Sequence, residues 1–423
     1  MNISIIGSGY VGLVAAICLA KLGNEVILID TDEDRINSIV NKVSPIYEVG
    51  LDAILKQVDI RATSNHQLMI DSELILICVG TPTNLDGSAS LEFVVTVASQ
   101  IASVLKEKDG YCVIGVKSTV VPGTIRDTVI PILESSGKRA GVDFGVCAVP
   151  EFLREGMAIY DFMNPARVII GEFDKRSGDV ISNLYNDFKA PIMRTDLITA
   201  EMIKYASNTF LVTKISFINE IGNICKRLGI NAYEVAKGMG FDDRIGSKYL
   251  NPGIGFGGSC LPKDIKALIA KAKQIGYEPR ILEEVLRLNE EQPKNLINLL
   301  KKHLTSIKGR NIGILGLSFK PGTDDIRESR AIDVIQALLQ EGAKLKAYDP
   351  LAMEKFRKLF PVVKYTHAQE VTECDAILIL TEWPEFNELD YKGKLVIDGR
   401  LIPKAKEARI YEGICWEQKH NTV

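Results

Sequence analysis

Short apolar runs alternate with helical patterns over the N-terminal part of the chain. Asn2–Ile6 and Glu25–Ile29 have the length and content of buried strands, and Leu13–Leu22 between them has the pattern of a helix that stops at a glycine. Three more apolar runs of strand length follow, at Glu73–Val79, Tyr111–Val116 and Phe144–Val149. Strands that alternate with helices predict a doubly wound parallel sheet, and we place this first domain at residues 1–195.

A dinucleotide-binding pattern follows the first strand. The turn reads Gly7-Ser8-Gly9-Tyr10-Val11-Gly12, and after it come a helix and a second strand that ends at Asp30. Glycines let the backbone approach a pyrophosphate at a helix N-terminus, where unpaired N–H groups favour anions. Asp30 would bind the adenosine ribose and would repel a 2′-phosphate within about 4 Å by about 4 kcal/mol, which favours NAD over NADP. Arg35 could instead hold that phosphate, and a glycine turn without a ligand is the other alternative.

The strand pattern stops over residues 196–305. Ala200–Leu228 reads as one long helix with apolar residues around much of its circumference. Such a helix is normally buried inside a domain or between subunits, so we expect a central helical domain here and a homodimer. Glu201, Lys204 and Asn208 lie at helical spacing and share one face of this helix. A polar face is usually solvated, but on a mostly apolar helix it is also a candidate site.

The α/β alternation returns from Lys308 and predicts a third domain over residues 306–423. Its expected elements are the strands Asn311–Leu315, Lys344–Tyr348, Ala376–Leu380 and Leu395–Ile397 and the helix Ser329–Gln340. The turn after its first strand, Gly316–Thr323, lacks a complete glycine fingerprint. We therefore predict an α/β protein in which two Rossmann-like, doubly wound domains are joined by a long helix and a helical middle region. Two such domains suggest two nucleotide-shaped ligands that face each other across a cleft.

Polar clusters follow the later strands of the first domain, at the end of a parallel sheet where ligands bind. They are Gly80-Thr81-Pro82-Thr83, Lys117-Ser118-Thr119-Val120-Val121-Pro122-Gly123 and Pro150-Glu151-Phe152-Leu153-Arg154-Glu155-Gly156. We expect chemistry at these turns, although each threonine could equally serve as a turn or cap residue.

The stretch Gly253–Asp264 places a cysteine behind four glycines. Glycines allow the backbone to press against a substrate, and Pro262 suits a first helical turn. Cys260 is therefore expected just before a helix N-terminus with Lys263 close behind, and both features should lower the pKa of its thiol. The other seven cysteines lie in apolar runs and read as core residues. An inert cysteine in a flexible loop is the alternative interpretation.

A nicotinamide site combined with an activated cysteine indicates a particular oxidation. Oxidising an alcohol to an aldehyde needs a base and a hydride acceptor, whereas carrying the aldehyde on to an acid needs a nucleophile as well. A thiolate supplies this nucleophile by forming a thiohemiacetal and then a thioester, which water hydrolyses. Lysine and asparagine can stabilise the oxyanion, and a carboxylate or a threonine can position the water.

Composition argues against several other classes of protein. The 51 basic and 54 acidic residues leave a net charge of -3, so the basic excess typical of proteins that bind nucleic acid or anionic membranes is missing. Ile3–Gly23 is apolar, but its glycines and the lack of a basic flank argue against a signal peptide or membrane span. The eight cysteines form no CxxC pair and have no histidines at zinc spacing, which predicts reduced thiols, no metal site and a cytoplasmic protein.

Together these motifs resemble those of the UDP-glucose/GDP-mannose dehydrogenase family over essentially the whole chain. The matching segments are Gly7–Gly12, Gly80–Thr83, Pro150–Gly156, Lys204 with Asn208, Gly255–Asp264, Gly316–Gly322 and Asp324–Ser329. The resemblance implies a homodimer built on the central helix, and the oxidation of the primary alcohol of a nucleotide sugar to a carboxylate with two NAD. NAD would bind the N-terminal domain, and a UDP-sugar would face the C-terminal one.

The resemblance also implies roles for individual residues. Cys260 would be the thioester nucleophile, and Lys204 with Asn208 would stabilise the oxyanion while Lys204 handles the alcohol proton. Asp264 would organise the lysine and a water, and Thr119 and Glu151 would position that water. The implied NAD contacts are Gly7, Gly9, Tyr10, Val11, Gly12, Asp30, Arg35, Thr83, Thr119, Glu155, Lys263 and Arg327. The implied substrate contacts are Glu151, Phe152, Lys204, Asn208, Tyr249, Leu250, Asn251, Gly253, Gly257, Lys320, Arg400 and the partner subunit's Arg244.

The identity of the sugar is a separate question from the reaction. Leu261 stands where phenylalanine is common in UDP-glucose enzymes, and relatives that act on GDP-mannose share the leucine. Asp243–Leu250 looks more like the UDP-glucose branch, so oxidation of UDP-glucose to UDP-glucuronate is our first expectation. The alternatives are GDP-mannose or a UDP-N-acetylhexosamine as substrate, a two-electron hydroxyacid dehydrogenase that does not use Cys260, and a non-catalytic NAD-binding thiol sensor.

Overall fold

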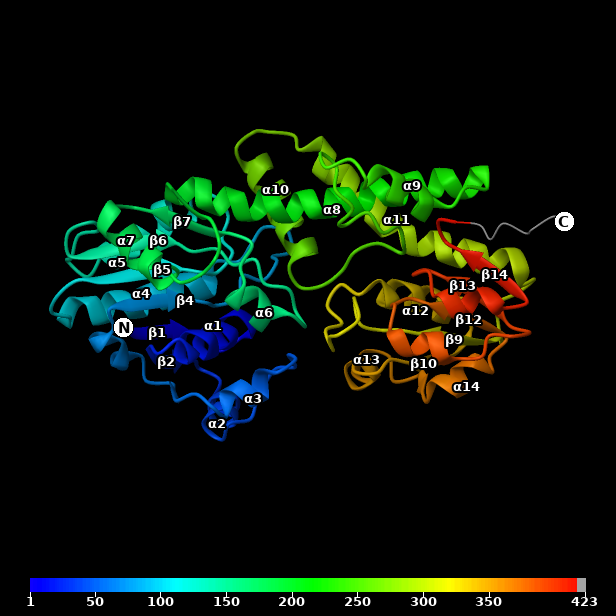
Figure 1. Ribbon diagram of the computed structural model, residues 1–423, viewed down its shortest axis with the longest axis horizontal. Coiled ribbons are helices and arrows are strands. Elements are labelled where there is room, and N and C mark those ends of the chain that lie inside the picture. The colour runs from blue at the N-terminus through cyan, green and yellow to red at the C-terminus, as the bar shows by residue number, and fades with distance from the viewer. Residues whose placement is uncertain (417–423) are drawn as a thin grey trace. The chain divides into compact units, whose positions relative to one another are not determined.

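The computed structural model describes residues 1–416 and divides the chain into two compact units. The first unit comprises residues 1–207 and 266–274, and the second comprises residues 208–265 and the chain from residue 275 onward. The boundary lies within helix α8 (Leu197–Leu228), so this one helix contributes to both units (Figure 1). The three-domain division at residues 195 and 305 stays a prediction.

An eight-stranded sheet forms the centre of the first unit, in the order β3-β2-β1-β4-β5-β6-β7-β8. The strands are β1 (Asn2–Ile6), β2 (Glu25–Ile29), β3 (Ile60–Thr63), β4 (Leu74–Ile77), β5 (Cys112–Val116), β6 (Phe144–Ala148), β7 (Val168–Glu172) and β8 (Ile192–Thr195). All neighbours pair in parallel except β6 and β7, which are antiparallel. Central strands such as β4 are apolar and buried throughout because helices cover both faces of the sheet.

The helices of the first unit supply one hydrophobic core on each face of this sheet. They are α1 (Tyr10–Lys21), α2 (Glu33–Val40), α3 (Leu51–Leu55), α4 (Glu92–Glu107), α5 (Ile130–Glu134), α6 (Ala158–Met163) and α7 (Lys175–Leu184). Leu13 of α1 and Phe162 of α6 belong to one core, whereas Ile101 of α4 and Leu133 of α5 belong to the other. This arrangement confirms the predicted doubly wound sheet.

Two details of the first unit differ from the sequence-based expectation. Strands β3, β7 and β8 are missed. The residues of β8 are half-exposed or exposed, so this strand lacks the apolar run of a buried strand. Strand β7, by contrast, is apolar and buried apart from Glu172, so it could have been predicted from its apolar run. Helix α1 begins at Tyr10 rather than at Leu13, because the end of the glycine turn is already helical. The Leu13 N–H accordingly donates to the Gly9 carbonyl oxygen at 2.9 Å.

A six-stranded parallel sheet forms the second unit, in the order β11-β10-β9-β12-β13-β14. The strands are β9 (Asn311–Leu315), β10 (Lys344–Tyr348), β11 (Lys364–Tyr365), β12 (Ala376–Ile379), β13 (Leu395–Asp398) and β14 (Ile410–Gly413). As in the first unit, the first strand is central and the chain crosses to either side of it, so a second Rossmann-like sheet is confirmed. The short strands β11 and β14 are missed by the apolar pattern.

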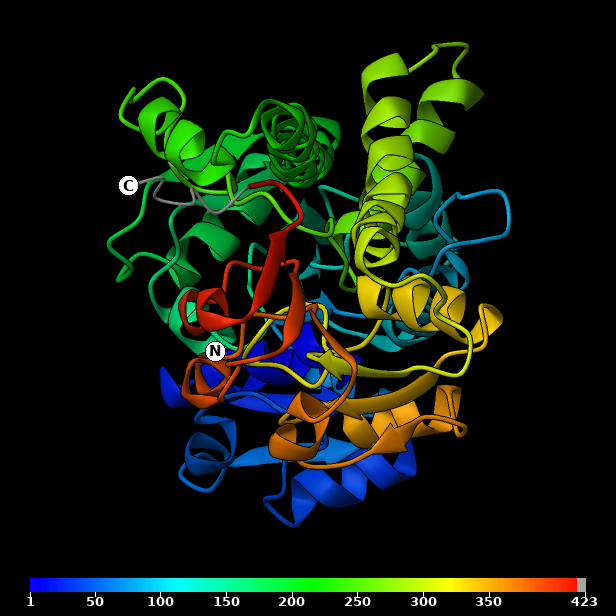
Figure 2. The same cartoon turned by 90° about the vertical axis from the view of Figure 1, so that its right-hand side faces the viewer.

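The remaining helices are α9 (Ala232–Met239), α11 (Arg280–His303), α12 (Arg330–Gln340), α13 (Met353–Leu359) and α14 (Ala368–Thr372), together with α10 (Leu261–Gln274), which the unit boundary also divides. Helix α11 packs on α12 (Figure 2) and also contacts β13. Across residues 1–416, no helix combines the length and the hydropathy needed to cross a lipid bilayer.

Candidate active site

The glycine turn between β1 and α1 has the shape that a dinucleotide requires. Gly7 has a φ of 100°, and a Cβ on Gly12 would lie 1.8 Å from the Gly7 carbonyl oxygen, so both positions need glycine. A Cβ on Gly9 would meet no protein atom within 4 Å, so this side of the turn is open. Because α1 begins at Tyr10, the open side lies next to a helix N-terminus, where a phosphate is favoured.

Asp30 supports this turn from the end of β2. Its Oδ2 accepts hydrogen bonds from the N–H and the hydroxyl of Ser8, at 2.5 and 2.6 Å. Burial acts to raise the pKa of Asp30, but the hydrogen bonds from Ser8 and from the N–H groups of Asp32 and Thr31 together outweigh burial and hold this pKa below its usual value. An ionised carboxylate suits ribose hydroxyls and would repel a 2′-phosphate. Arg35, the alternative phosphate ligand, is exposed and lies 3.2 Å from Asp32.

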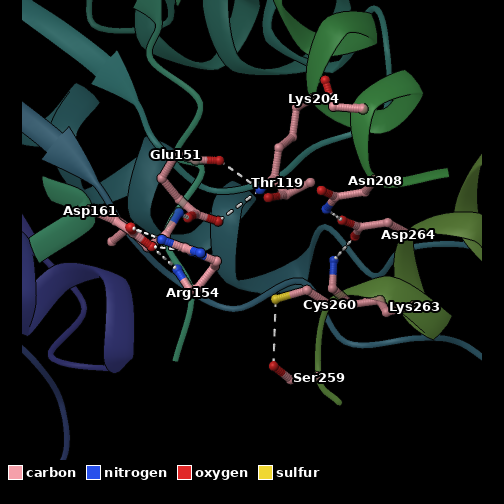
Figure 3. Close-up of polar contacts among 12 residues, drawn as sticks. Thr119, Glu151, Arg154, Asp161, Lys204, Asn208, Ser259, Cys260, Lys263 and Asp264 are labelled. Atoms are coloured by element: carbon pink, nitrogen blue, oxygen red, sulfur yellow. Dashed lines mark hydrogen bonds and ion pairs between the residues drawn. The ribbon is translucent and has the colours of Figure 1, made fainter. Parts of the chain in front are cut away.

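The first unit brings Lys204 and Glu151 together as a buried ion pair (Figure 3). The Lys204 Nζ lies 2.6 Å from the carbonyl oxygen of Glu151 and 3.0 Å from its Oε1, and the two side chains are 5% and 6% exposed. Burial alone would raise the pKa of Glu151, but the Lys204 charge and the N–H of Leu153 outweigh it and lower that pKa. The ring of Phe152 lies 5.2 Å from the same ammonium.

Thr119 lies beside this ion pair, in the turn after β5. A small cavity of about 10 Å³ is lined by residues of this turn, including Ser118 and Thr119, and by Pro150, Glu201 and Lys204. This volume is close to the minimum for one water molecule. Three segments that are far apart in the sequence therefore meet at one point of the first unit.

Cys260 lies in the second unit, and its side chain is exposed. It directly precedes α10, and the N–H of Asp264 donates to its carbonyl oxygen at 2.9 Å, which confirms the predicted position before a helix N-terminus. The Ser259 hydroxyl lies 3.5 Å from its sulfur (Figure 3). The other seven cysteines are buried, and burial raises the pKa of thiols such as Cys147 and Cys415 to about 12. Cys260 therefore has the accessibility that a nucleophile needs.

Asp264 joins two more of the predicted residues. Its carboxylate is buried and accepts a hydrogen bond from the Asn208 amide at 2.6 Å and another from the Lys263 ammonium at 2.5 Å (Figure 3). The Asn208 amide and the Lys263 ammonium are thereby fixed at the start of α10. Lys204 and Asn208 are four residues apart on α8, so they share one face of that helix.

The glycine segment before Cys260 packs against the turn that follows β9. A Cβ on Gly257 would lie 2.2 Å from the carbonyl oxygen of Glu328, and the N–H of Gly258 donates to the carbonyl oxygen of Arg327 at 2.9 Å. Gly258 also has a φ of 89°. These positions exclude side chains for reasons of packing, in addition to any approach by a ligand.

Comparison with known proteins identifies one family over most of the chain. Residues 1–189 match the NAD binding domain of the UDP-glucose/GDP-mannose dehydrogenase family, residues 198–291 its central domain and residues 313–405 its UDP binding domain. The chain belongs to this family.

Full-length relatives of this family carry two different substrate names. The chain is 41% identical to UDP-glucose 6-dehydrogenase AglM of Haloferax volcanii, with 98% of this chain and 100% of that protein covered. It is 40% identical to GDP-mannose 6-dehydrogenase of Pseudomonas syringae pv. syringae, again with 98% and 100% covered. The structure of a UDP-glucose dehydrogenase from Pyrobaculum islandicum is similar with a TM-score of 0.96 and 40% identity, covering 98% of each chain.

Family membership fixes the cofactor and the class of reaction. As a UDP-glucose/GDP-mannose dehydrogenase, the protein is an NAD-dependent nucleotide-sugar dehydrogenase. The glycine turn and the ionised Asp30 lie within the NAD binding domain and fit this cofactor. The match to a UDP binding domain supports a UDP-sugar as the substrate.

The other residues predicted to bind NAD lie in both units. In the first unit, Thr83 is exposed in the turn after β4, and Glu155 is half-buried in the turn after β6. In the second unit, the Arg327 guanidinium lies 2.6 Å from Asp325. Contact of these side chains with NAD stays a prediction.

The other residues predicted to bind the UDP-sugar lie in the second unit. The Lys320 ammonium lies 5.6 Å from the ring of Phe319, and Arg400 donates to the carbonyl oxygen of Gly255 at 3.3 Å. Tyr249 and Asn251 lie in the segment between α9 and α10, and Tyr249 has a φ of 66°. Leu250 is packed in an apolar cluster, and Arg244 is exposed and paired with Asp242.

Sequence reasoning missed the polar residues that hold these segments in place. Asn289 of α11 accepts a hydrogen bond from the Phe256 N–H and donates to the Phe256 carbonyl, and Gln292 donates to the Gly253 carbonyl. In the first unit, the buried Glu48 accepts hydrogen bonds from the N–H groups of Gly156 and Ala158. Asn289 and Gln292 are polar and lie three residues apart on an amphipathic helix. This spacing was the signal in the sequence that could have indicated them.

Proposed function

We propose that this dehydrogenase oxidises UDP-glucose to UDP-glucuronate through a thioester on Cys260. The observation that carries the proposal is the contrast between one exposed cysteine at a helix N-terminus and seven buried cysteines. Additional support comes from the UDP binding domain match and from relatives named UDP-glucose 6-dehydrogenase. GDP-mannose is the second candidate, because Leu261 matches enzymes acting on that sugar and a relative with 40% identity carries that name.

In the proposed mechanism, Cys260 makes and breaks one carbon–sulfur bond. When bound, NAD serves as the hydride acceptor for both oxidations. The alcohol first loses a hydride and a proton to give an aldehyde, and the Cys260 thiolate adds to its carbon to form a thiohemiacetal. Loss of the second hydride leaves a thioester. Water then attacks the thioester carbon, the carbon–sulfur bond breaks, and the carboxylate and the regenerated thiolate separate with release of protons to solvent.

The remaining groups would stabilise charge and orient water. We assign Lys204 and Asn208 as donors to the oxygen on which negative charge develops, with Lys204 also handling the alcohol proton. Asp264 fixes the Asn208 amide, and Glu151 fixes the Lys204 ammonium. Thr119 and Glu151 would position the hydrolytic water. These roles follow from the resemblance to the family and from the contacts within each unit.

Two further expectations belong to the same proposal. Helix α8 carries exposed apolar side chains, which supports a homodimer built on this helix and a contribution from the partner subunit's Arg244. The cytoplasmic location stays a prediction that rests on reduced thiols.

A substrate panel tests the proposed function. The purified protein is incubated with NAD and with UDP-glucose, UDP-N-acetylhexosamines or GDP-mannose, and NADH and product are both quantified. We expect UDP-glucose to react fastest and to give two NADH for each UDP-glucuronate. One NADH with an aldehyde or ketone product would support the two-electron dehydrogenase, and a faster reaction with GDP-mannose would reassign the sugar. Absence of reduction with every sugar would favour the thiol sensor.

A further inference from the structure

Glu201 is a buried carboxylate on α8 whose two oxygens bind backbone rather than side chains. It is 3% exposed, and its Oε2 accepts a hydrogen bond from the Gly123 N–H at 2.6 Å while its Oε1 accepts one from the Ile125 N–H at 2.9 Å. Burying a carboxylate costs free energy unless its oxygens are satisfied. Bonds to two backbone groups fix the path of the chain, so Glu201 acts on the shape of the turn it binds.

The turn that Glu201 binds is the one that carries Thr119. Gly123 follows Thr119 by four residues and has a φ of 96°, so the chain reverses there in a conformation that suits glycine. At the other side of the turn, the Thr81 hydroxyl donates to the carbonyl oxygen of Thr119 at 2.9 Å. Glu201 and Thr81 therefore hold the Thr119 turn from both sides.

The same face of α8 carries Lys204. Glu201 and Lys204 are three residues apart on this helix, and Lys204 is bound to Glu151 in the turn after β6. The small cavity described above is lined by Thr119, Glu201 and Lys204. One helix thus holds the turns after β5 and β6 through two neighbouring side chains.

We propose that Glu201 is a positioning residue for the oxidation, because it holds the Thr119 turn in fixed register with the Lys204 ammonium. The inference rests on the proposed function, in which Thr119 and Lys204 act on one substrate. Glu201 itself touches backbone groups, so its effect on the reaction passes through Thr119.

The charges around Glu201 make this support dependent on pH. Burial raises the pKa of Glu201 to about 7, against the hydrogen bonds from Ile125 and Gly123, which lower it. Asp127 raises this pKa further, and Lys271 of α10 lowers it. Below about pH 7 the carboxyl takes up a proton and becomes a weaker acceptor, so the turn should loosen as the pH falls through this value.

Glu201→Gln in the full chain tests the proposal. The glutamine oxygen can accept one N–H, but its NH2 group faces the second donor, so the turn should shift. We expect kcat to fall on the order of 10- to 100-fold with little change in the KM for the sugar. Hydrogen exchange at the Gly123 and Ile125 amides, followed by mass spectrometry, should be faster than in the unchanged enzyme. Glu107→Gln, at an exposed position on α4 in the same unit, is the matched control and should change neither quantity.

One further measurement keeps the test decisive. In the unchanged enzyme, the exchange rate of these two amides should rise as the pH falls through about 7, after correction for the intrinsic effect of pH on exchange. This measurement does not depend on whether a variant folds. Faster exchange in Glu201→Gln together with an unchanged kcat would overturn the positioning role. An exchange rate that changes neither with the substitution nor with the pH would overturn it as well. If the unchanged enzyme oxidises no nucleotide sugar, the proposed function fails whatever the exchange data show.

Discussion

Burial separates Cys260 from the other cysteines at the scale of single residues. A buried thiol cannot ionise easily in apolar surroundings, and the pKa values of Cys18 and Cys78 are both raised to about 12. Cys260 is exposed and directly precedes helix α10. One side chain thus has the access that covalent chemistry requires.

We expect Cys260→Ser to remove net acid formation by several orders of magnitude, on the order of 10³-fold or more, because a serine hydroxyl is a far weaker nucleophile at neutral pH. NAD affinity, measured by calorimetry, should be retained because the glycine turn is unchanged. Cys374→Ala, at a buried position in the second unit, is the control and should keep its turnover. Turnover of Cys260→Ser close to that of the unchanged enzyme would remove the thioester mechanism.

At the scale of elements, an acidic residue follows the second strand of each Rossmann-like sheet, but the two residues differ in their surroundings. Asp30 follows β2 and is only partly buried, whereas Asp349 follows β10 and is fully buried. Both oxygens of Asp349 are engaged by the protein, with donors that include the N–H groups of Leu317 and Leu351. The acidic residue in the first sheet can meet a ligand, and its counterpart in the second sheet holds the local fold together.

The turn after β13 should make the stability of the second unit depend on pH. Burial raises the pKa of Asp398 from 3.8 to about 6, although the N–H groups of Arg400 and Ile402 act to lower it. The folded state therefore binds a proton between about pH 4 and pH 6 that the unfolded state releases. The stabilising contribution is complete below about pH 4 and is lost as the pH rises through 6, with a size of about 3 kcal/mol.

Asp398→Asn should flatten this dependence. The free energy of unfolding is measured in urea at several pH values by tryptophan fluorescence, because both tryptophans, Trp383 and Trp416, lie in the second unit. The exposed Asp390→Asn is the control and should keep the slope. An equal slope in Asp398→Asn and the unchanged protein would contradict the assignment.

At the scale of the whole molecule, α8 leaves an apolar stripe exposed. Phe210, Phe217 and Ile224 follow one another at seven-residue intervals and are 64%, 46% and 50% exposed. Large apolar side chains repeated along one helix face are typical of a contact between subunits. The stripe supports the proposed homodimer.

We expect Phe217→Glu to weaken this dimer, because a charge would be buried in an apolar contact. Light scattering at micromolar concentration should give the mass of a dimer for the unchanged protein and a smaller average mass for the variant, while circular dichroism stays the same. Glu107→Gln, at an exposed position on α4, is the control and should leave the mass unchanged. A monomeric unchanged protein would contradict the proposed assembly.

The sequence by itself determined the α/β alternation, the glycine turn, the long helix and the setting of Cys260. These features depend on neighbours in the chain: apolar runs predict buried strands, and glycine is required where the backbone allows no side chain. Edge strands such as β8 escaped prediction because half-exposed residues carry no apolar run.

Only the tertiary structure decided which polar residues meet. The contact of Glu201 with the Gly123 N–H spans 78 positions of the chain, and that of Asn208 with Asp264 spans 56. A carboxylate that binds a distant backbone has the same local pattern as one on a solvated helix face. The difference appears only when two segments pack together and exclude water, because burial then makes each hydrogen bond of that carboxylate necessary.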